Sequence, residues 1–162
     1  MNDLIDLKEA LDILNIQRLL YTSLRSTDEK DWTLFKACFA DEVTIDFVGV
    51  QPAATVSIEA LCAQSERNYV DLKTQHMSTN LDVRVEGNSA RSTSHGRARH
   101  EYVGDGASVS SDRAIWHIYA RYENDYIRTA DGWKISRIMM EPLWQEGNLH
   151  LLEDAAKSKD RA

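Results

Sequence analysis

Histidine is the residue type in this chain best suited to proton transfer near neutral pH, and the chain has five of them. A neutral imidazole can remove a proton from carbon when a carboxylate holds its other ring nitrogen and stabilises the imidazolium that forms. The histidines show no HxxxH or HExxH spacing, and the two cysteines, Cys38 and Cys62, form no CxxC pair. The residues therefore favour acid/base chemistry over a zinc site, and proton transfer of this kind needs no metal, nucleotide or flavin.

Asp28 is a candidate for the carboxylate, because it stands in the polar run 26–31 that interrupts the apolar pattern on either side. Aspartate is also a preferred N-cap, so Asp28 could equally begin the helix that follows. His76 or His100, taken alone, is explained just as well as a buried side chain with a hydrogen-bonded partner. The pattern by itself leaves the catalytic and the structural interpretation open.

Three helices are predicted in the first half of the chain. Apolar residues recur at helical spacing over residues 4–24, a second helix begins at Trp32, and residues 57–69 form a third helix capped by Ser57. In the first helix Lys8, Asp12 and Asn15 share a polar side.

The second half of the chain predicts a sheet. Strands are expected at residues 73–85, 90–102, 112–128 and 133–140, with turn signals at 86–88, 104–106 and 130–132 and an earlier short strand at 43–47. Helices followed by an antiparallel sheet indicate an α+β fold in which the helices cover one face of the sheet.

Strand alternation sorts the side chains between the two faces of this sheet. In the second long strand the even positions are expected to face inward, which places His100 inside and His95 outside. In the third, the inward row is Trp116, Ile118, Ala120, Tyr122, Tyr126 and Arg128. Arg128 would end a largely apolar row, or it could pair with Asp125 or with the C-terminal tail. Alternation does not decide which way His76 points.

Size and charge narrow the class of protein. At 162 residues the chain fits one domain, expected over residues 1–146 and followed by a charged, partly disordered tail over 147–162. The net charge of −7 would repel nucleic acid and acidic membrane surfaces. No apolar run approaches the ~20 residues that span a bilayer, and the first residues lack the features of a signal peptide, so a cytoplasmic location is expected.

Four motifs make the chain similar to a known family: Thr27-Asp28-Glu29-Lys30-Asp31-Trp32, Thr74-Gln75-His76, Arg99-His100, and Arg128 followed by Asp131-Gly132-Trp133-Lys134. From about residue 7 to residue 144 the sequence resembles scytalone dehydratase and its SnoaL-like relatives, within the nuclear-transport-factor-like cone superfamily. The resemblance implies a cone-shaped, curved antiparallel sheet that packs on three N-terminal helices and encloses a pocket.

The same resemblance implies roles for individual residues. Asp28 and His76 would form a buried dyad, and His100 would be a second histidine able to protonate a leaving hydroxyl. Arg128 would contact the substrate or the leaving group. The pocket is expected to be lined by Tyr21, Phe47, Trp116, Tyr122, Tyr126 and Arg128.

The function implied is a cofactor-independent lyase of the dehydratase type, or an isomerase, acting on a hydrophobic cyclic small molecule. Thr27 and Phe47 stand where scytalone dehydratase has tyrosines that help to polarise its substrate, so scytalone itself is not the expected substrate. A homo-oligomer, either a trimer or a dimer, is expected to form through Ile115, Tyr119 and Ile127 on the outer face of the sheet.

Two other functions remain open at this point. The first is a non-catalytic cone domain, either a ligand-binding module or a structural β subunit of a ring-hydroxylating dioxygenase, and neither needs an inward Asp-His pair. The second is an enzyme similar to ketosteroid isomerase, which would use a carboxylate as its base.

Overall fold

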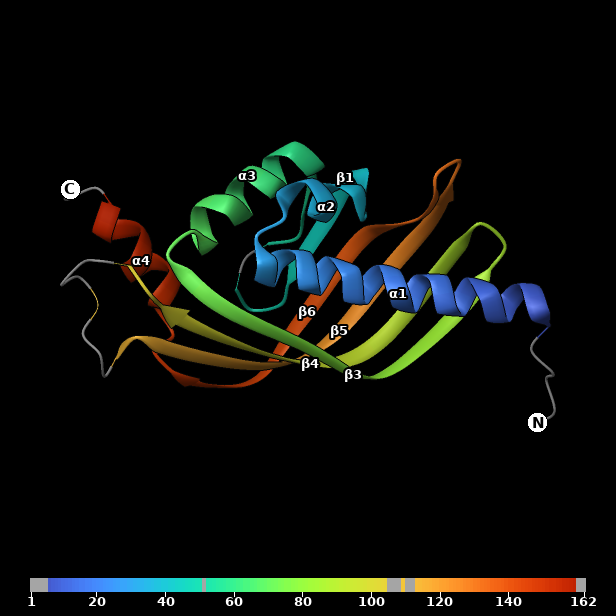
Figure 1. Cartoon of the computed structure of the whole chain (residues 1–162). Coiled ribbons are helices and arrows are strands. Elements are labelled where there is room, and N and C mark those ends of the chain that lie inside the picture. The colour runs from blue at the N-terminus through green and yellow to red at the C-terminus, as the bar shows by residue number, and fades with distance from the viewer. Residues whose placement is uncertain (1–5, 51, 105–108, 110–112, 160–162) are drawn as a thin grey trace.

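A long helix lies along one face of a curved six-stranded sheet (Figure 1). The structure is a computed structural model that describes residues 6–50, 52–104, 109 and 113–159. The elements in chain order are α1 (Leu7–Glu29), α2 (Trp32–Ala37), β1 (Phe39–Phe47), β2 (Ala54–Ser57), α3 (Ile58–Tyr69), β3 (Leu72–Glu86), β4 (Ser89–Tyr102), β5 (Ile115–Thr129), β6 (Gly132–Gly147) and α4 (Leu151–Lys159). The predicted helix start at residue 4, the predicted strand start at 112 and most of the turn at 104–106 lie outside the described residues.

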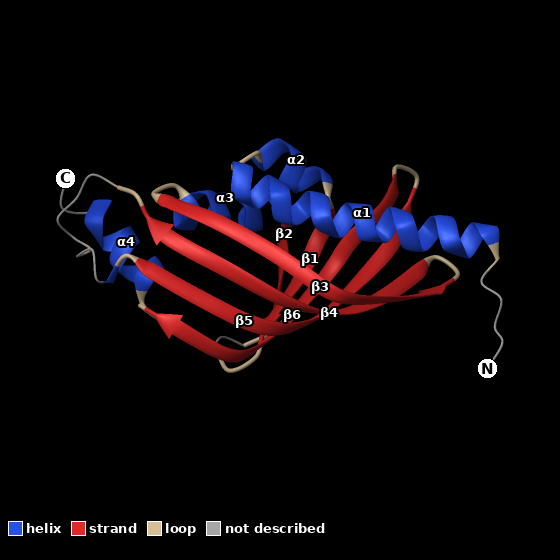
Figure 2. Cartoon of the chain, turned by 60° about the horizontal axis from the view of Figure 1, so that its bottom comes forward, coloured by secondary structure: helices blue, strands red, loops and turns tan. Residues whose placement is uncertain are grey.

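The strand order is β2-β1-β6-β5-β4-β3, and all neighbouring strands are antiparallel except β1 and β6, which are parallel. The predicted curved antiparallel sheet is confirmed for the long strands, and the β1–β6 pair is a parallel exception within it. Either direction is possible there, because most of the chain separates β1 from β6 and no tight hairpin joins them. Figure 2 shows α1 and α2 gathered on one side of the twisted sheet, which agrees with the predicted α+β arrangement.

Helix α1 continues through the polar run where a turn was predicted. The side chains of Ser26 and Thr27 are buried, and both hydroxyls donate to the carbonyl oxygen of Ser23, at 2.9 and 3.0 Å. These polar groups are thus satisfied inside the helix, which ends only at Lys30 in the left-handed conformation. Asp28 therefore lies in the last turn of α1.

The N-cap of α2 is Asp31, whose carboxylate accepts a hydrogen bond of 2.9 Å from the backbone N–H of Leu34. The alternative in which Asp28 caps this helix is therefore wrong. Helix α3 is capped as predicted, since the Ser57 hydroxyl accepts a hydrogen bond of 3.2 Å from the backbone N–H of Ala60.

The main core lies between the helices and the sheet. It joins Ile16 of α1 and Phe35 of α2 to Tyr126 and Ile135 of the sheet. The faces of β4 follow the predicted alternation along the whole strand, with its even positions buried or half-buried. Strand β4 therefore presents one side-chain face to the inner side of the sheet over its full length.

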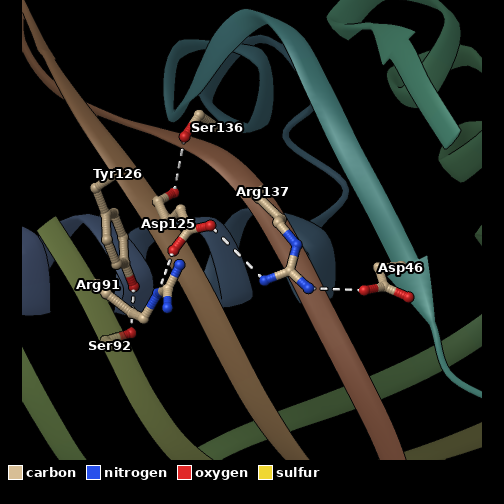
Figure 3. Close-up of polar contacts among 7 residues, drawn as sticks. All are labelled: Asp46, Arg91, Ser92, Asp125, Tyr126, Ser136 and Arg137. Carbon is tan, nitrogen blue, oxygen red and sulfur yellow. Dashed lines mark hydrogen bonds and ion pairs between the residues drawn. The ribbon is translucent and has the colours of Figure 1, made fainter. Parts of the chain in front are cut away.

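Ion pairs cross the outer face of the sheet (Figure 3). Arg91 of β4 contacts Asp125 of β5 at 2.7 Å, and Arg137 of β6 lies 3.7 Å from Asp125 and 2.7 Å from Asp46 of β1. Tyr126, the next residue after Asp125, is buried on the inner face. Partly exposed ion pairs contribute about 1 kcal/mol or less each to the stability of a fold. This row links β4, β5, β6 and β1, so its main effect is to fix how these four strands are aligned.

The charged C-terminal segment contains a packed helix, α4. Leu151 is fully buried and Ala155 is 5% exposed, and both pack with Leu72 against Tyr69 and Trp116. The predicted charged tail, expected to be partly disordered, is therefore helical over α4. In the part of the chain that the structure describes, no helix is both long and apolar enough to cross a membrane.

Candidate active site

The last turn of α1 brings Asp28 against His76, near the start of β3. The distance from Nδ1 of His76 to Oδ1 of Asp28 is 2.7 Å. The backbone N–H of His76 donates to Oδ2 at 2.9 Å, and the Thr74 hydroxyl donates to Oδ1 at 2.8 Å. An ionised carboxylate can only accept, so this contact places the ring proton on Nδ1 and leaves the lone pair on Nε2.

Asp28 is held as an anion in this position. Burial acts to raise the pKa of Asp28, but hydrogen bonds from His76 and Thr74 outweigh burial and leave the pKa below its ordinary value. Only 21% of the Asp28 side chain and 14% of the His76 side chain is exposed. The carboxylate can therefore stabilise positive charge on the imidazole with little competition from water.

His100 of β4 lies beside His76, with ring centroids 5.5 Å apart and ring planes at 90°. His100 is 2% exposed, and burial lowers its pKa to about 3, with the neighbouring His76 acting in the same direction. It is therefore neutral near pH 7. Among the described residues its Nδ1 atom has no hydrogen-bond partner. Because it is neutral, the ring suits a hydrogen-bonding role better than the role that the resemblance implied, which was to protonate a leaving hydroxyl.

Two aromatic rings enclose the His100 ring. Trp116 of β5 stacks on it with centroids 4.5 Å apart, and Tyr69 at the end of α3 stacks at 5.8 Å. Burial, and then the charge of Asp28, raise the pKa of Tyr69 to about 12, so it stays a protonated phenol. Because α4 packs against Tyr69 and Trp116, this helix holds the ring stack in place.

An apolar wall continues from Trp116 along the inner face of the sheet. Phe47, Trp116 and Tyr122 pack against a buried cluster formed by Ala98, Ile118, Ala120 and Met140. Gly96 makes room for this wall, since a Cβ atom at this position would collide with the Tyr122 ring. Of these three aromatic residues, Trp116 stacks on His100 beside the dyad, and Trp116 and Tyr122 lie on the face that alternation predicted.

Three of the residues predicted to line the pocket lie away from the dyad: Tyr21, Tyr126 and, as described below, Arg128. Tyr21 is 40% exposed on the outer side of α1, where the Gln17 amide donates to its hydroxyl at 3.4 Å. Tyr126 is 1% exposed and belongs to the main core, with its hydroxyl 2.8 Å from that of Ser92. Along β5, Tyr126 and Trp116 are separated by about 34 Å, at 3.4 Å per residue. Neither tyrosine can line the same small site as the dyad.

Arg128 pairs with Asp12 instead of facing a substrate. Two hydrogen bonds join the guanidinium to the carboxylate, one of them 2.9 Å long, and the Trp133 ring lies 4.3 Å below. Asp12 is about 24 Å along α1 from Asp28, at 1.5 Å per residue. Asp12 itself is 6% exposed, although the sequence placed it on a polar side of its helix. The expected role of Arg128 as a substrate anchor is therefore corrected.

Tyr69 and Thr74 are site residues that the sequence reasoning missed. Thr74 could have been found, because it shares a strand face with His76 two residues later and so points toward the same carboxylate. Tyr69 carries no comparable signal, since its position depends on how the end of α3 meets β4 in space.

A cavity under α1 has a volume of about 20 Å³ and is lined in part by Ser78, which follows His76 by two residues, and by Tyr122. Neither Asp28 nor His76 lines it. Within the described ranges, no three His, Cys, Asp or Glu side chains come together as a metal site would require.

Comparison with known proteins identifies a domain family that covers most of the chain and solved structures that share its fold. The SnoaL-like domain family matches residues 8–139 of the chain. The Kfla4162 protein from Kribbella flavida is 28% identical, with a TM-score of 0.82 over 89% of this chain and 98% of that chain. No curated protein matches the chain.

Two further structures share the fold at lower identity. A candidate scytalone dehydratase from Novosphingobium aromaticivorans is 16% identical, with a TM-score of 0.72 over 85% of this chain and 88% of that chain. A type 2 hexachlorocyclohexane dehydrochlorinase is 18% identical, with a TM-score of 0.68 over 85% and 92% of the two chains. At these identities the likeness shows the fold alone, the curved sheet and helices of the nuclear-transport-factor-like cone.

Proposed function

The chain belongs to the SnoaL-like domain family, and from this premise we propose that it is a lyase that removes water from a hydrophobic cyclic substrate without a cofactor. The observation that carries the proposal is the 2.7 Å contact between His76 and Asp28. Elimination is also the chemistry named for two proteins of the same fold, a dehydratase and a dehydrochlorinase. An isomerase would use the same base and differ only in where the proton is returned.

The proposed reaction begins at Nε2 of His76. This nitrogen takes a proton from a carbon next to a carbonyl group, and Asp28 stabilises the imidazolium that results. The electron pair of the broken C–H bond forms a C=C bond as the C–O bond to the leaving hydroxyl breaks. His76 then returns the proton to that hydroxyl, which leaves as water. General acid/base catalysis of this kind contributes roughly 10²–10⁴-fold in rate.

The oxygen of the substrate carbonyl needs a hydrogen-bond donor as negative charge develops on it. Tyr69 and His100 are both neutral groups beside His76. Each can donate a hydrogen bond while it remains uncharged. Donors that are already fixed in a dry site stabilise such charge more strongly than water does. We assign them this role in the reaction.

The proposed substrate is uncharged and carries a ring. Phe47, Trp116 and Tyr122 pack on one apolar cluster, which reaches the histidines through the stacking of Trp116 on His100, and flat rings stack well on aromatic side chains. Arg128, the cation that could have attracted an anionic substrate, is neutralised by its ion pair with Asp12. Asp12 lies about 24 Å along α1 from Asp28.

The test is to incubate the purified protein with a panel of cyclic β-hydroxy ketones and no added cofactor. Loss of water creates a conjugated enone, which is followed by ultraviolet absorbance and by mass spectrometry. We expect turnover for at least one member, and its loss in the His76→Ala variant. Tyr21→Phe is a matched control, because Tyr21 lies outside the site and should retain full activity.

A His76→Ala variant with kcat near that of the wild type would contradict the proposal. Ring compounds that bind but do not react would instead favour the ligand-binding alternative, in which Asp28 and His76 serve recognition or stability only.

A further inference from the structure

Two donors share one oxygen atom of the Asp28 carboxylate. The Thr74 hydroxyl lies 2.8 Å from Oδ1, and Nδ1 of His76 lies 2.7 Å from the same atom. The other oxygen, Oδ2, accepts the backbone N–H of His76 at 2.9 Å. His76 therefore contacts both oxygens by itself, and orienting the carboxylate does not account for the third bond, from Thr74.

Thr74 is buried on the inner face of β3, between Leu72 and His76 and opposite His100 of β4. Its exposed fraction is 9%, and Leu72 is fully buried. Because an ionised carboxylate can only accept, the hydroxyl proton of Thr74 points at Asp28. The hydroxyl is thus a fixed dipole, and its positive end is directed at the oxygen that holds the His76 proton.

A hydrogen bond to a carboxylate stabilises the negative charge and lowers its affinity for protons. The bond from Thr74 acts on Asp28 in this direction, as the bonds from His76 do. Since Thr74 and His76 donate to the same atom, the negative charge of Oδ1 is divided between them. Without the Thr74 hydroxyl, Oδ1 would attract the Nδ1 proton of His76 more strongly and would stabilise an imidazolium further.

The strength of this attraction matters for both halves of the proposed reaction. A strong attraction helps Nε2 of His76 to take the proton from carbon, but it also holds the imidazolium and slows the return of the proton to the leaving hydroxyl. A group that both takes and gives a proton works best at an intermediate proton affinity.

We propose that Thr74 is a positioning residue that acts through Asp28: it shares Oδ1 with His76 and so keeps the dyad weak enough to give back the proton that it takes. The inference rests on the proposed function for the return of the proton. The sharing of Oδ1 itself can be tested without any turnover.

Three titratable side chains face His76 in the described part of the chain: Asp28 from α1, Tyr69 from α3 and His100 from β4. Burial raises the pKa of Tyr69 to about 12 and lowers the pKa of His100 to about 3. Neither of these two changes its charge near neutral pH. The acidic limb of a pH–rate profile therefore reports on Asp28 and His76 together.

The first experiment is proton NMR of the Nδ1–H group of His76 at neutral pH. This proton resonates far downfield of the backbone amides, and its signal is identified by its absence in His76→Ala. In Thr74→Val, which loses the hydroxyl at nearly constant volume, we expect the signal to move further downfield as the bond to Oδ1 strengthens. Thr74→Ser returns a hydroxyl and should recover the wild-type position.

The matched control is Thr79→Val, the same chemical change on the outer face of the same strand. The Thr79 hydroxyl donates to the backbone carbonyl of His95 at 3.4 Å, so its loss should leave the signal in place. Thr74→Ala also lacks the hydroxyl and replaces Thr74→Val if valine prevents folding.

The second experiment is the pH–rate profile on the first substrate found. Thr74→Val should move the acidic limb to higher pH by about one unit, since a hydrogen bond to a charged group contributes about a factor of ten. Thr74→Ser should bring the limb back, and Thr79→Val should not move it.

An unchanged or upfield signal in Thr74→Val would overturn the proposal, even if the melting temperature falls, because a purely structural threonine affects stability alone. A downfield shift with an unmoved acidic limb would overturn the role in proton return. If the signal moves downfield but His76→Ala retains turnover, the sharing of Oδ1 stands and the proposed function fails.

Discussion

Replacing Asp28 with asparagine should lower kcat by about a thousandfold while the protein remains folded. The imidazolium of His76 and the carboxylate of Asp28 would be adjacent, with Nδ1 and Oδ1 2.7 Å apart. For unit charges separated by about 4 Å, in surroundings with an effective dielectric constant near 20, the attraction is about 4 kcal/mol. Since 1.36 kcal/mol is a factor of ten, losing this charge costs about three orders of magnitude.

Asparagine also disturbs the hydrogen bonds that orient the ring. Both carboxylate oxygens of Asp28 accept, two bonds at Oδ1 and one at Oδ2. An amide offers only one accepting atom, so its NH2 group must face either the backbone N–H of His76 or the ring. Against the ring it would move the proton of His76 to Nε2 and remove the base.

The assay is steady-state turnover on the first substrate found, with Asp31→Asn as the matched control. Asp31 undergoes the same chemical change three residues away, and asparagine is an equally good N-cap for α2. We expect the control to keep wild-type kcat and melting temperature. If Asp28→Asn keeps kcat within a few-fold of the wild type, the dyad does not act as the base.

Three further predictions concern other parts of the molecule. His100→Gln should lower kcat about tenfold, because one hydrogen bond to the substrate is weakened. The acidic limb of the pH–rate profile should stay in place, because the pKa of His100 is already about 3. A shift of that limb would contradict the neutral role of His100. Asp12→Asn should reduce stability against urea at about pH 7 and much less at about pH 2. Hydrogen bonds from Arg128 and Trp133 lower the pKa of Asp12 from 3.8 to about 2, so the stabilisation is complete above the unfolded value and is lost as pH falls through about 2; equal losses at both pH values would refute this. Trp144→Glu should convert a homo-oligomer into an 18.5 kDa monomer in light scattering, because Trp144 is 55% exposed and stacks on Tyr119 on the outer face of the sheet; a wild-type protein that is monomeric at micromolar concentration would disprove it.

Local pattern was enough to predict which face of a strand a residue occupies. His100 is buried and His95 is exposed because strand side chains alternate strictly, and the small even positions of β4 can only pack inward. The same rule placed Tyr126 and Arg128 on the inner face. It could not show how far they are from Trp116, because strands of this length span two separate regions of one face.

Contacts between residues that are far apart in the sequence could not be predicted from local residue spacing. Asp28 and His76 are 48 residues apart, and Arg128 and Asp12 are 116 apart. Asp12 looked like a surface residue because its partner comes from the far end of the sheet. The dyad was predicted only through the family resemblance, which records a long-range contact that periodicity does not contain.

The packing of α4 on Tyr69 and Trp116 couples the position of this helix to the protonation of His100. These two rings keep water from His100, and burial is the main reason why its pKa is lowered to about 3. With α4 displaced, His100 would meet water and its pKa would return toward the ordinary value of about 6.5. Only that open form binds a proton between these two values, so lowering the pH from about 6.5 toward about 3 reduces the free energy that displacing α4 costs.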